Sequence, residues 1–315
     1  MFLGLWDLLV APALPVVARA SLCDAHGAAT GLMQFAVGKD GTADIVFDPV
    51  RDGIMVYSEP KTGCGSLEWS AGPMLEPPCR VRHGRGTRAI MCHAESCATD
   101  FLNSRPPGSR TWVLSSNRNP FEMRPSALFQ EIYGHWTAHD IMTANVSTLV
   151  DLFHAKYGKS SPRWWTKHFY DTFGLNITAQ PFDFQNKFLH VEHVWNSRRL
   201  SVIIVRLEDS HQWSEILGRF FPKMRLVTAN EMAAKGSNVL ASRYREFLNA
   251  LSWTDTELDF NSRTESFTHF YTTEEQRAFL GAARSRGMPS AGVAAASADG
   301  HGDVALGDSG ALPTC

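Results

Sequence analysis

Residues 60–67, with the sequence Pro-Lys-Thr-Gly-Cys-Gly-Ser-Leu, place one lysine and two glycines directly after a buried-type apolar run at 54–56. Glycine lets a backbone turn its N–H groups towards one point, and Lys61 adds a positive charge there. A helix that begins after such a turn directs the positive end of its dipole at the same point. The stretch therefore predicts a strand, an anion-binding loop and the start of a helix.

The order of these residues excludes a Walker A loop, in which the lysine follows the last glycine. Here Lys61 precedes both Gly63 and Gly65. A nucleoside triphosphatase is therefore disfavoured. Taken alone, the stretch also fits a lysine in an ordinary glycine-rich turn.

A second apolar run ends just before Arg118, and Ser126 follows in a helical pattern at 121–137. The planar guanidinium can make paired hydrogen bonds to phosphate oxygens, and a nearby hydroxyl can add another donor. Pro125 must either kink this helix or begin a new one, and a new start would leave Ser126 among free N–H groups. The alternative is a solvated arginine beside a helix N-cap at Asn119.

These two segments, in this order, resemble the cofactor-binding segments of sulfotransferases that use 3′-phosphoadenosine 5′-phosphosulfate (PAPS). Residues 60–67 resemble the loop that holds the 5′-phosphosulfate, and Arg118 with Ser126 resembles the element that holds the 3′-phosphate. Two further blocks, 164–183 and 201–209, are similar to the capsular polysaccharide synthesis proteins, which are sulfotransferase-like chains.

The resemblance covers roughly residues 50–280, and the chain departs from the family pattern at three points. Cys64 and Gly65 stand where the family normally has hydroxyl side chains, Pro125 replaces an ordinary helix former, and Gly-Ser-Asn at 236–238 stands where the family usually has bulky aromatic residues. The resemblance implies a P-loop sulfotransferase-like fold and transfer of a sulfuryl group from PAPS to a hydroxyl or amine, on a carbohydrate or a small molecule. It implies that PAPS is bound by Lys61, Thr62, Gly63, Cys64, Gly65, Ser66, Leu67, Arg118 and Ser126.

Sulfuryl transfer also needs charge stabilisation at the bridging oxygen and a base for the acceptor's proton. Lys61 is the candidate for the first role. His93 is the candidate base, because it follows an apolar strand expected at 88–93 and imidazole exchanges protons near neutral pH. Glu59 and Glu95 are rival bases, since burial can raise the pKa of a carboxyl. A core histidine at 93 and a Glu59 that only balances Lys61 are the structural alternatives.

Two other enzyme or binding classes stay open from the sequence. A kinase with an atypical phosphate loop would need ATP and Mg²⁺, and a degenerate sulfotransferase-like protein would take part in polysaccharide synthesis without catalysis. No metal is expected, because the pair His135 and His139 and the pair His190 and His193 each lack an evident third ligand.

Composition indicates one compact main domain that can bury a large core. The 315 residues are 44% hydrophobic with a net charge of −2, which argues against a chain organised around nucleic acid. A basic run from Arg80 to Arg88 could meet an anionic cofactor, or could be a solvated loop.

Strands and helices alternate along the chain, and this alternation predicts a three-layer sandwich around a mainly parallel sheet. We expect ligands outside the carboxyl ends of its strands. Acceptor specificity is assigned to loops at 72–88, 100–110 and 177–200. Strands are expected near 43–48, 54–58, 88–93, 111–116 and 201–206, and helices near 66–71, 121–137, 146–157, 163–172, 212–220 and 239–251.

The two ends differ from the expected domain at 21–284. Residues 1–20 are apolar and end in a small-x-small pattern, which fits a signal peptide or a membrane anchor and equally fits a buried strand or a truncated gene start. Residues 285–315 are rich in Ala, Gly and Ser, which predicts a disordered tail. A secretory or Golgi location is slightly favoured, since the cysteines at 79, 92 and 97 could form a disulfide and two N-x-[ST] sequons are present.

Overall fold

The structure is a computed structural model that describes residues 36–37, 43–44, 46–74, 88–135, 143–159, 163–226 and 238–286. The apolar segment at 1–20 and the tail from residue 287 lie outside the described residues. Among the described residues, no helix is both long enough and apolar enough to cross a membrane.

The centre of the fold is a five-stranded sheet with the order β4-β3-β5-β7-β6. Its strands are β3 (Gly53–Tyr57), β4 (Ala89–Cys92), β5 (Arg110–Asn117), β6 (Phe188–Trp195) and β7 (Arg198–Arg206). The pairs β4·β3, β3·β5 and β5·β7 are parallel, and β6 runs antiparallel to β7. The prediction of an α/β fold with a mainly parallel sheet is confirmed.

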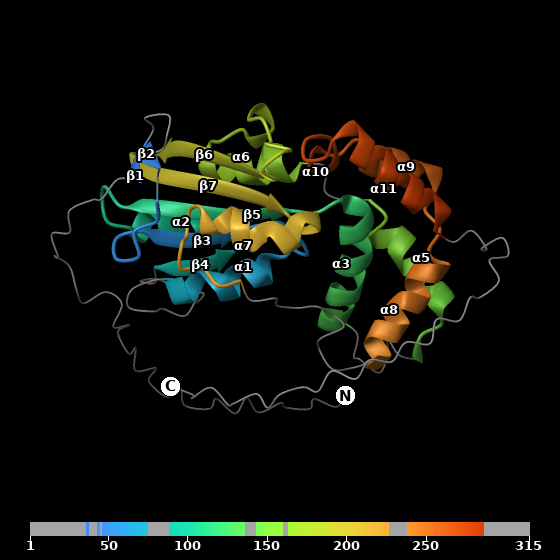
Figure 1. The fold of residues 1–315 in the computed structure, drawn as a ribbon. Helices are drawn as coiled ribbons and strands as arrows, with labels where there is room; N and C mark the ends of the chain where they lie inside the picture. The colour runs from blue at the N-terminus through green and yellow to red at the C-terminus, as the bar shows by residue number, and fades with distance from the viewer. Residues whose placement is uncertain are drawn as a thin grey trace, which may run out of the picture.

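Helices cover both faces of this sheet (Figure 1). On one face α1 (Cys64–Ala71) and α7 (Trp213–Gly218) pack against side chains such as Val56 and Leu114. The other face is covered by α2 (Glu95–Ser104) and by the helical segment formed by η3 (Trp164–Phe169) and α6 (Tyr170–Phe173). β3 along its whole length and β7 over residues 202–205 are continuous apolar runs, because these parts of the central strands are buried on both faces.

A second group of helices lies beyond the arrowheads of β5 and β7 (Figure 1). Their aromatic side chains form a continuous core, in which Phe121 contacts both Trp253 and Phe267. The helices are α3 (Pro120–His135), α5 (Val146–Lys156), α8 (Asn238–Ala250), α9 (Asp255–Ser262), α10 (Glu265–Thr268) and α11 (Thr273–Ser285). Short helices complete the described chain at η2 (Gly72–Met74), η4 (Ile177–Ala179) and η5 (Leu207–Gln212).

Two expectations about strands and loops were wrong. The strand expected at 43–48 is reduced to β2 (Ala43–Asp44), which pairs with β1 (Ala36–Val37) outside the main sheet. The region 177–200, taken as a specificity loop, contains β6 and the turn to β7. This strand alternates partly buried and exposed residues, as an edge strand does, and its turn uses Asn196 and Ser197 with positive φ angles.

The region 100–110 is also expected to be a loop, but residues 100–104 form the second half of α2. Phe101 and Leu102 are buried there against the sheet. Their apolar pair was the sequence signal for this helix.

Candidate functional site

The loop at 58–63 connects the carboxyl end of β3 to the first turn of α1, as predicted. Lys61 has a φ of 74° and Gly63 a φ of 98°, so the loop turns through two left-handed positions. The Thr62 hydroxyl donates to the Glu59 carbonyl at 2.7 Å and lies 3.0 Å from the Ser116 hydroxyl. Thr62 is thus buried beneath the loop and ties it to the end of β5.

Gly63 is fixed by what surrounds it. A Cβ atom at this position would lie 2.8 Å from Leu207 Cδ1 and 2.9 Å from Trp213 Cη2. The Trp213 indole is itself held, because it donates to the Arg206 carbonyl at 2.9 Å. Both the backbone conformation and the space therefore require glycine at residue 63.

Small hydroxyl residues join the ends of β3 and β5. The Ser116 amide donates to the Ser58 hydroxyl at 2.9 Å, and the Ser58 hydroxyl donates to the Ser115 hydroxyl at 3.4 Å. These side chains are fully buried and leave the two strand ends close together. The loop after β3 and the turn after β5 are neighbours for this reason.

Arg118 follows β5 and reaches across to the loop. Its Nη1 atom donates to the Lys61 carbonyl at 3.4 Å, across 57 positions of the sequence. Its Nη2 atom lies 3.9 Å from a carboxylate oxygen of Glu122 in the next helical turn. The structure therefore brings together the two elements that the sequence singled out.

The helix after Arg118 is continuous from Pro120 and contains Pro125, so it does not restart there. Proline has no N–H to give to the carbonyl of Phe121, and that carbonyl instead accepts from Arg286 Nη1 at 3.1 Å. Arg286 also pairs with Glu122 through its other nitrogen. Asn119 caps the helix, with its Oδ1 accepting from the Phe121 amide at 2.9 Å, as the alternative for this region predicted.

Ser126 lies deeper in this helix than a new start would have placed it. It is buried, at a position about 9 Å along the axis from Pro120 at a rise of about 1.5 Å per residue. Its amide is therefore not among the free N–H groups at the start of the helix. Its role with the 3′-phosphate stays a prediction.

His93 follows β4 directly and is exposed. Its Nδ1 atom lies 2.8 Å from the carbonyl oxygen of Ser58. A disulfide joins Cys92 to Cys97, on either side of the turn that carries His93. The candidate base is thus anchored to the same loop as Lys61.

Glu59 is buried, and no described residue forms a hydrogen bond or ion pair with its carboxylate. Burial raises the pKa of this carboxyl to about 7, with Arg124 opposing the shift and Glu265 adding to it. Its electrostatic neighbours are therefore Arg124 and Glu265. The simple interpretation, in which Glu59 only balances Lys61, has no support in these contacts.

The remaining loop residues form the first turn of α1. Gly65 and Ser66 are partly exposed there, and Leu67 is buried in the core of the sheet. Cys64 is free, and burial raises the pKa of its thiol, which keeps it uncharged at neutral pH. An uncharged thiol leaves the positive field of the loop intact.

Two charged side chains are engaged in contacts within the protein. Asp209 pairs with Arg206 at 2.5 Å. Arg88 is buried and donates to the carbonyls of Pro49 and Asp52, before the start of β3, so it is not available to an anion at the loop. Residues 80–85 of the basic run lie outside the described residues.

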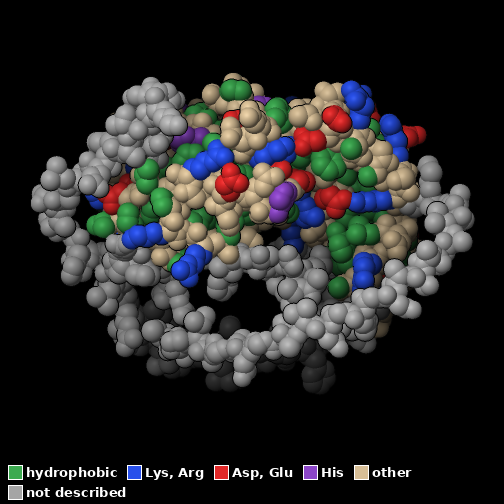
Figure 2. Space-filling model, viewed as in Figure 1, with side chains coloured by type: hydrophobic (Ala, Val, Ile, Leu, Met, Phe, Trp, Pro, Cys, Tyr) green, Lys and Arg blue, Asp and Glu red, His purple; other side chains and the backbone are tan. Residues whose placement is uncertain are grey.

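Comparison with protein-family models, with curated proteins and with solved structures gave no match. Within the described part of the chain, no group of three or more His, Cys, Asp or Glu side chains could hold a metal ion. Figure 2 shows basic and acidic side chains interspersed on the face that it displays, which fits the net charge of −2.

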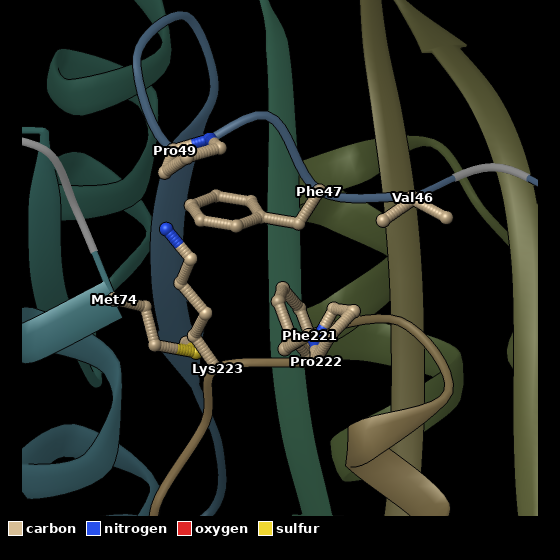
Figure 3. Close-up of a pocket in the computed structure, with 7 residues that line it drawn as sticks. All are labelled: Val46, Phe47, Pro49, Met74, Phe221, Pro222 and Lys223. Atoms are coloured by element: carbon tan, nitrogen blue, oxygen red, sulfur yellow. The ribbon is translucent and has the colours of Figure 1, made fainter. Parts of the chain in front are cut away.

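An apolar pocket lies at the amino end of β3, away from the loop (Figure 3). Among the described residues of its lining Lys223 is the only charged one, and its side chain extends towards Pro49. None of these described lining residues is a carboxylic acid or a histidine. Its members are Val46, Phe47, Pro49, Met74, Phe221, Pro222 and Lys223.

Proposed function

We propose that this protein is a PAPS-dependent sulfotransferase that moves a sulfuryl group to a hydroxyl or amine of a carbohydrate acceptor. The observation that carries the proposal is the contact between Arg118 and the Lys61 carbonyl. This contact joins the loop after β3 to the turn after β5, the two segments whose residues suit the binding of an anion. Both segments lie at the carboxyl ends of adjacent parallel strands, where ligands of open α/β sheets bind. A donor with phosphates at both its 3′ and 5′ positions matches two such elements.

In the proposed reaction the acceptor oxygen or nitrogen attacks the sulfur, and the bond from sulfur to the bridging phosphate oxygen breaks. The charge that develops on this oxygen is offset by Lys61 and by the first turn of α1. The acceptor's proton passes to Nε2 of His93, while Nδ1 keeps its hydrogen bond to the carbonyl oxygen of Ser58. The other product is adenosine 3′,5′-bisphosphate.

Calorimetric titration of the full-length protein tests the donor site. The ligands are adenosine 3′,5′-bisphosphate, adenosine 5′-monophosphate and ATP with Mg²⁺. We expect the bisphosphate to bind more tightly than the monophosphate. Arg118→Ala should cost about 1.5–3 kcal/mol of bisphosphate binding, the range for a hydrogen bond to a charged group.

The control is Arg219→Ala, because Arg219 is exposed and pairs with Glu215 away from the loop. It should leave all three affinities unchanged. Equal binding of the bisphosphate by wild type and Arg118→Ala would remove Arg118 from the site. Preference for ATP with Mg²⁺ would instead favour a kinase, and no binding by the folded protein would favour a non-catalytic relative.

A further inference from the structure

We propose that Glu208 is a positioning residue for the 3′-phosphate site, and that it acts by fixing the turn that carries Arg118. The proposal deepens the proposed function and rests on it. Glu208 lies in η5, directly after β7, and was not among the residues that the sequence singled out for binding or catalysis. The strand that it follows, β7, neighbours β5 on the side away from β3.

Both carboxylate oxygens of Glu208 are used within the protein. Oε1 accepts from the backbone amide of Asn119 at 2.8 Å and from its side-chain Nδ2 at 3.4 Å. Oε2 accepts from the hydroxyl of Tyr271 at 2.7 Å. One side chain thus links the end of β7, the turn after β5 and the segment before α11.

The bond to the Asn119 amide fixes the peptide that joins Asn119 to Arg118. Asn119 is buried, so without Glu208 its amide would be left without a partner inside the protein. The Asn119 carbonyl also accepts from the Met123 amide at 3.0 Å, and its side chain caps the helix. Glu208 therefore determines both the direction in which Arg118 leaves the backbone and the start of α3.

The other end of the link is rigid. Tyr271 is buried, and its hydroxyl also accepts from Asn117 Nδ2 at 3.2 Å. The same nitrogen of Asn117 donates to the Ser266 carbonyl at 2.9 Å. Glu208 is consequently held from two sides, and it transmits the position of the α10 and α11 region to Arg118.

The surroundings of Glu208 fit this role. Burial raises the pKa of Glu208 above its ordinary value, and its hydrogen bonds with Asn119 and Tyr271 and the nearby charge of Arg118 offset this only in part. Because both oxygens already accept hydrogen bonds, Glu208 does not compete for Arg118 as a free carboxylate would. A neutral glutamine can still accept the Asn119 amide through its oxygen.

The test uses Glu208→Ala and Glu208→Gln in the full-length protein, with calorimetric Kd values for adenosine 3′,5′-bisphosphate and adenosine 5′-monophosphate. We expect Glu208→Ala to reduce the preference for the bisphosphate by about tenfold, with the monophosphate affinity little changed. Glu208→Gln should retain most of the preference. Asp209→Asn is the control for general loss of stability, because it weakens the pairing with Arg206 and leaves Glu208 in place.

Hydrogen exchange of the Asn119 amide gives a second readout that needs no ligand. Exchange should be faster in Glu208→Ala than in wild type, and close to wild type in Glu208→Gln. Unchanged exchange, or an equal loss of affinity for both ligands, would overturn the positioning role. Absence of any bisphosphate preference in the wild type would overturn the proposed function and this inference with it.

Discussion

The Nδ1 atom of His93 lies 2.8 Å from the carbonyl oxygen of Ser58. A carbonyl oxygen only accepts hydrogen bonds, so Nδ1 carries the hydrogen and Nε2 of the neutral ring carries a lone pair. His93 is exposed, and Ser58 begins the loop that contains Lys61. The tautomer is therefore the one that a general base beside the loop requires.

We expect His93→Ala to lower sulfuryl transfer by about 10²- to 10⁴-fold, the usual contribution of a positioned base. Bisphosphate affinity should change little, since no proposed phosphate contact involves His93. Glu95→Gln is the matched variant, because Glu95 is exposed in the same turn and is one of the two rival bases. The measurement is initial rate with labelled PAPS and an acceptor found by screening. Full activity in His93→Ala together with a loss in Glu95→Gln would assign the base to Glu95.

Glu59 predicts a pH dependence of stability. Its pKa is raised from 4.5 to about 7 in the folded protein, so the folded state holds a proton that the unfolded state has released between these values. The contribution is fully present below about pH 4.5 and is lost as pH rises through about 7. Glu59→Gln should therefore stabilise the protein by up to about 3 kcal/mol at pH 8, at 1.36 kcal/mol per pKa unit.

Urea unfolding of wild type and Glu59→Gln at pH 5 and pH 8 measures this effect. The gain from the substitution should be small at pH 5, where Glu59 is already mostly protonated. Glu257→Gln is a useful contrast, because Glu257 is also buried but accepts hydrogen bonds from His154 and the Thr254 amide. It should destabilise the protein. A pH-independent difference between wild type and Glu59→Gln would show that Glu59 does not titrate in this range.

The sequence predicted the part of the site that depends on local chemistry. A strand, a glycine turn and a helix start are encoded by neighbouring residues, and so is the N-cap at Asn119. Glu208 was missed as a support for Arg118 because its partners lie 89 and 63 positions away in the chain. Its sequence neighbourhood shows only an acidic pair after a strand. Such distant hydrogen bonds depend on how β7 and α11 pack, which periodicity does not reveal.

The same limit explains the errors in the fold. β6 was missed because this edge strand carries polar residues such as His190 and Glu192 within its apolar pattern. Asn196 and Ser197 form the turn between β6 and β7 with positive φ angles, although neither is the glycine that usually marks such a turn in a sequence. The helix continues through Pro125 because Arg286, from the far end of the domain, donates the hydrogen bond that the Phe121 carbonyl would otherwise lack.

The disulfide between Cys92 and Cys97 should hold the turn that carries His93. The double variant Cys92→Ser with Cys97→Ser should lose about 2 kcal/mol of stability, the chain-entropy value for so short a loop. Amide exchange at 93–96 should rise more than elsewhere, because the turn would lose its covalent link to α2. Cys64→Ser is the control, since Cys64 is free. Exchange that is unchanged at 93–96 would show that Ser58 alone holds His93.

Gly63 and Gly108 allow the cost of a left-handed backbone conformation to be separated from the cost of a steric clash. Gly63 and Gly108 both have positive φ angles, of 98° and 76°, but an added Cβ meets nothing within 4 Å at Gly108. Gly108→Ala should therefore cost only the left-handed penalty of about 1–2 kcal/mol. Gly63→Ala carries the same penalty and in addition forces Leu207 and Trp213 apart from the loop. It should cost clearly more stability and should also weaken bisphosphate binding, because the loop that carries Lys61 must shift. Equal losses for the two variants, measured by thermal unfolding and calorimetry, would mean that Leu207 and Trp213 move without disturbing the loop.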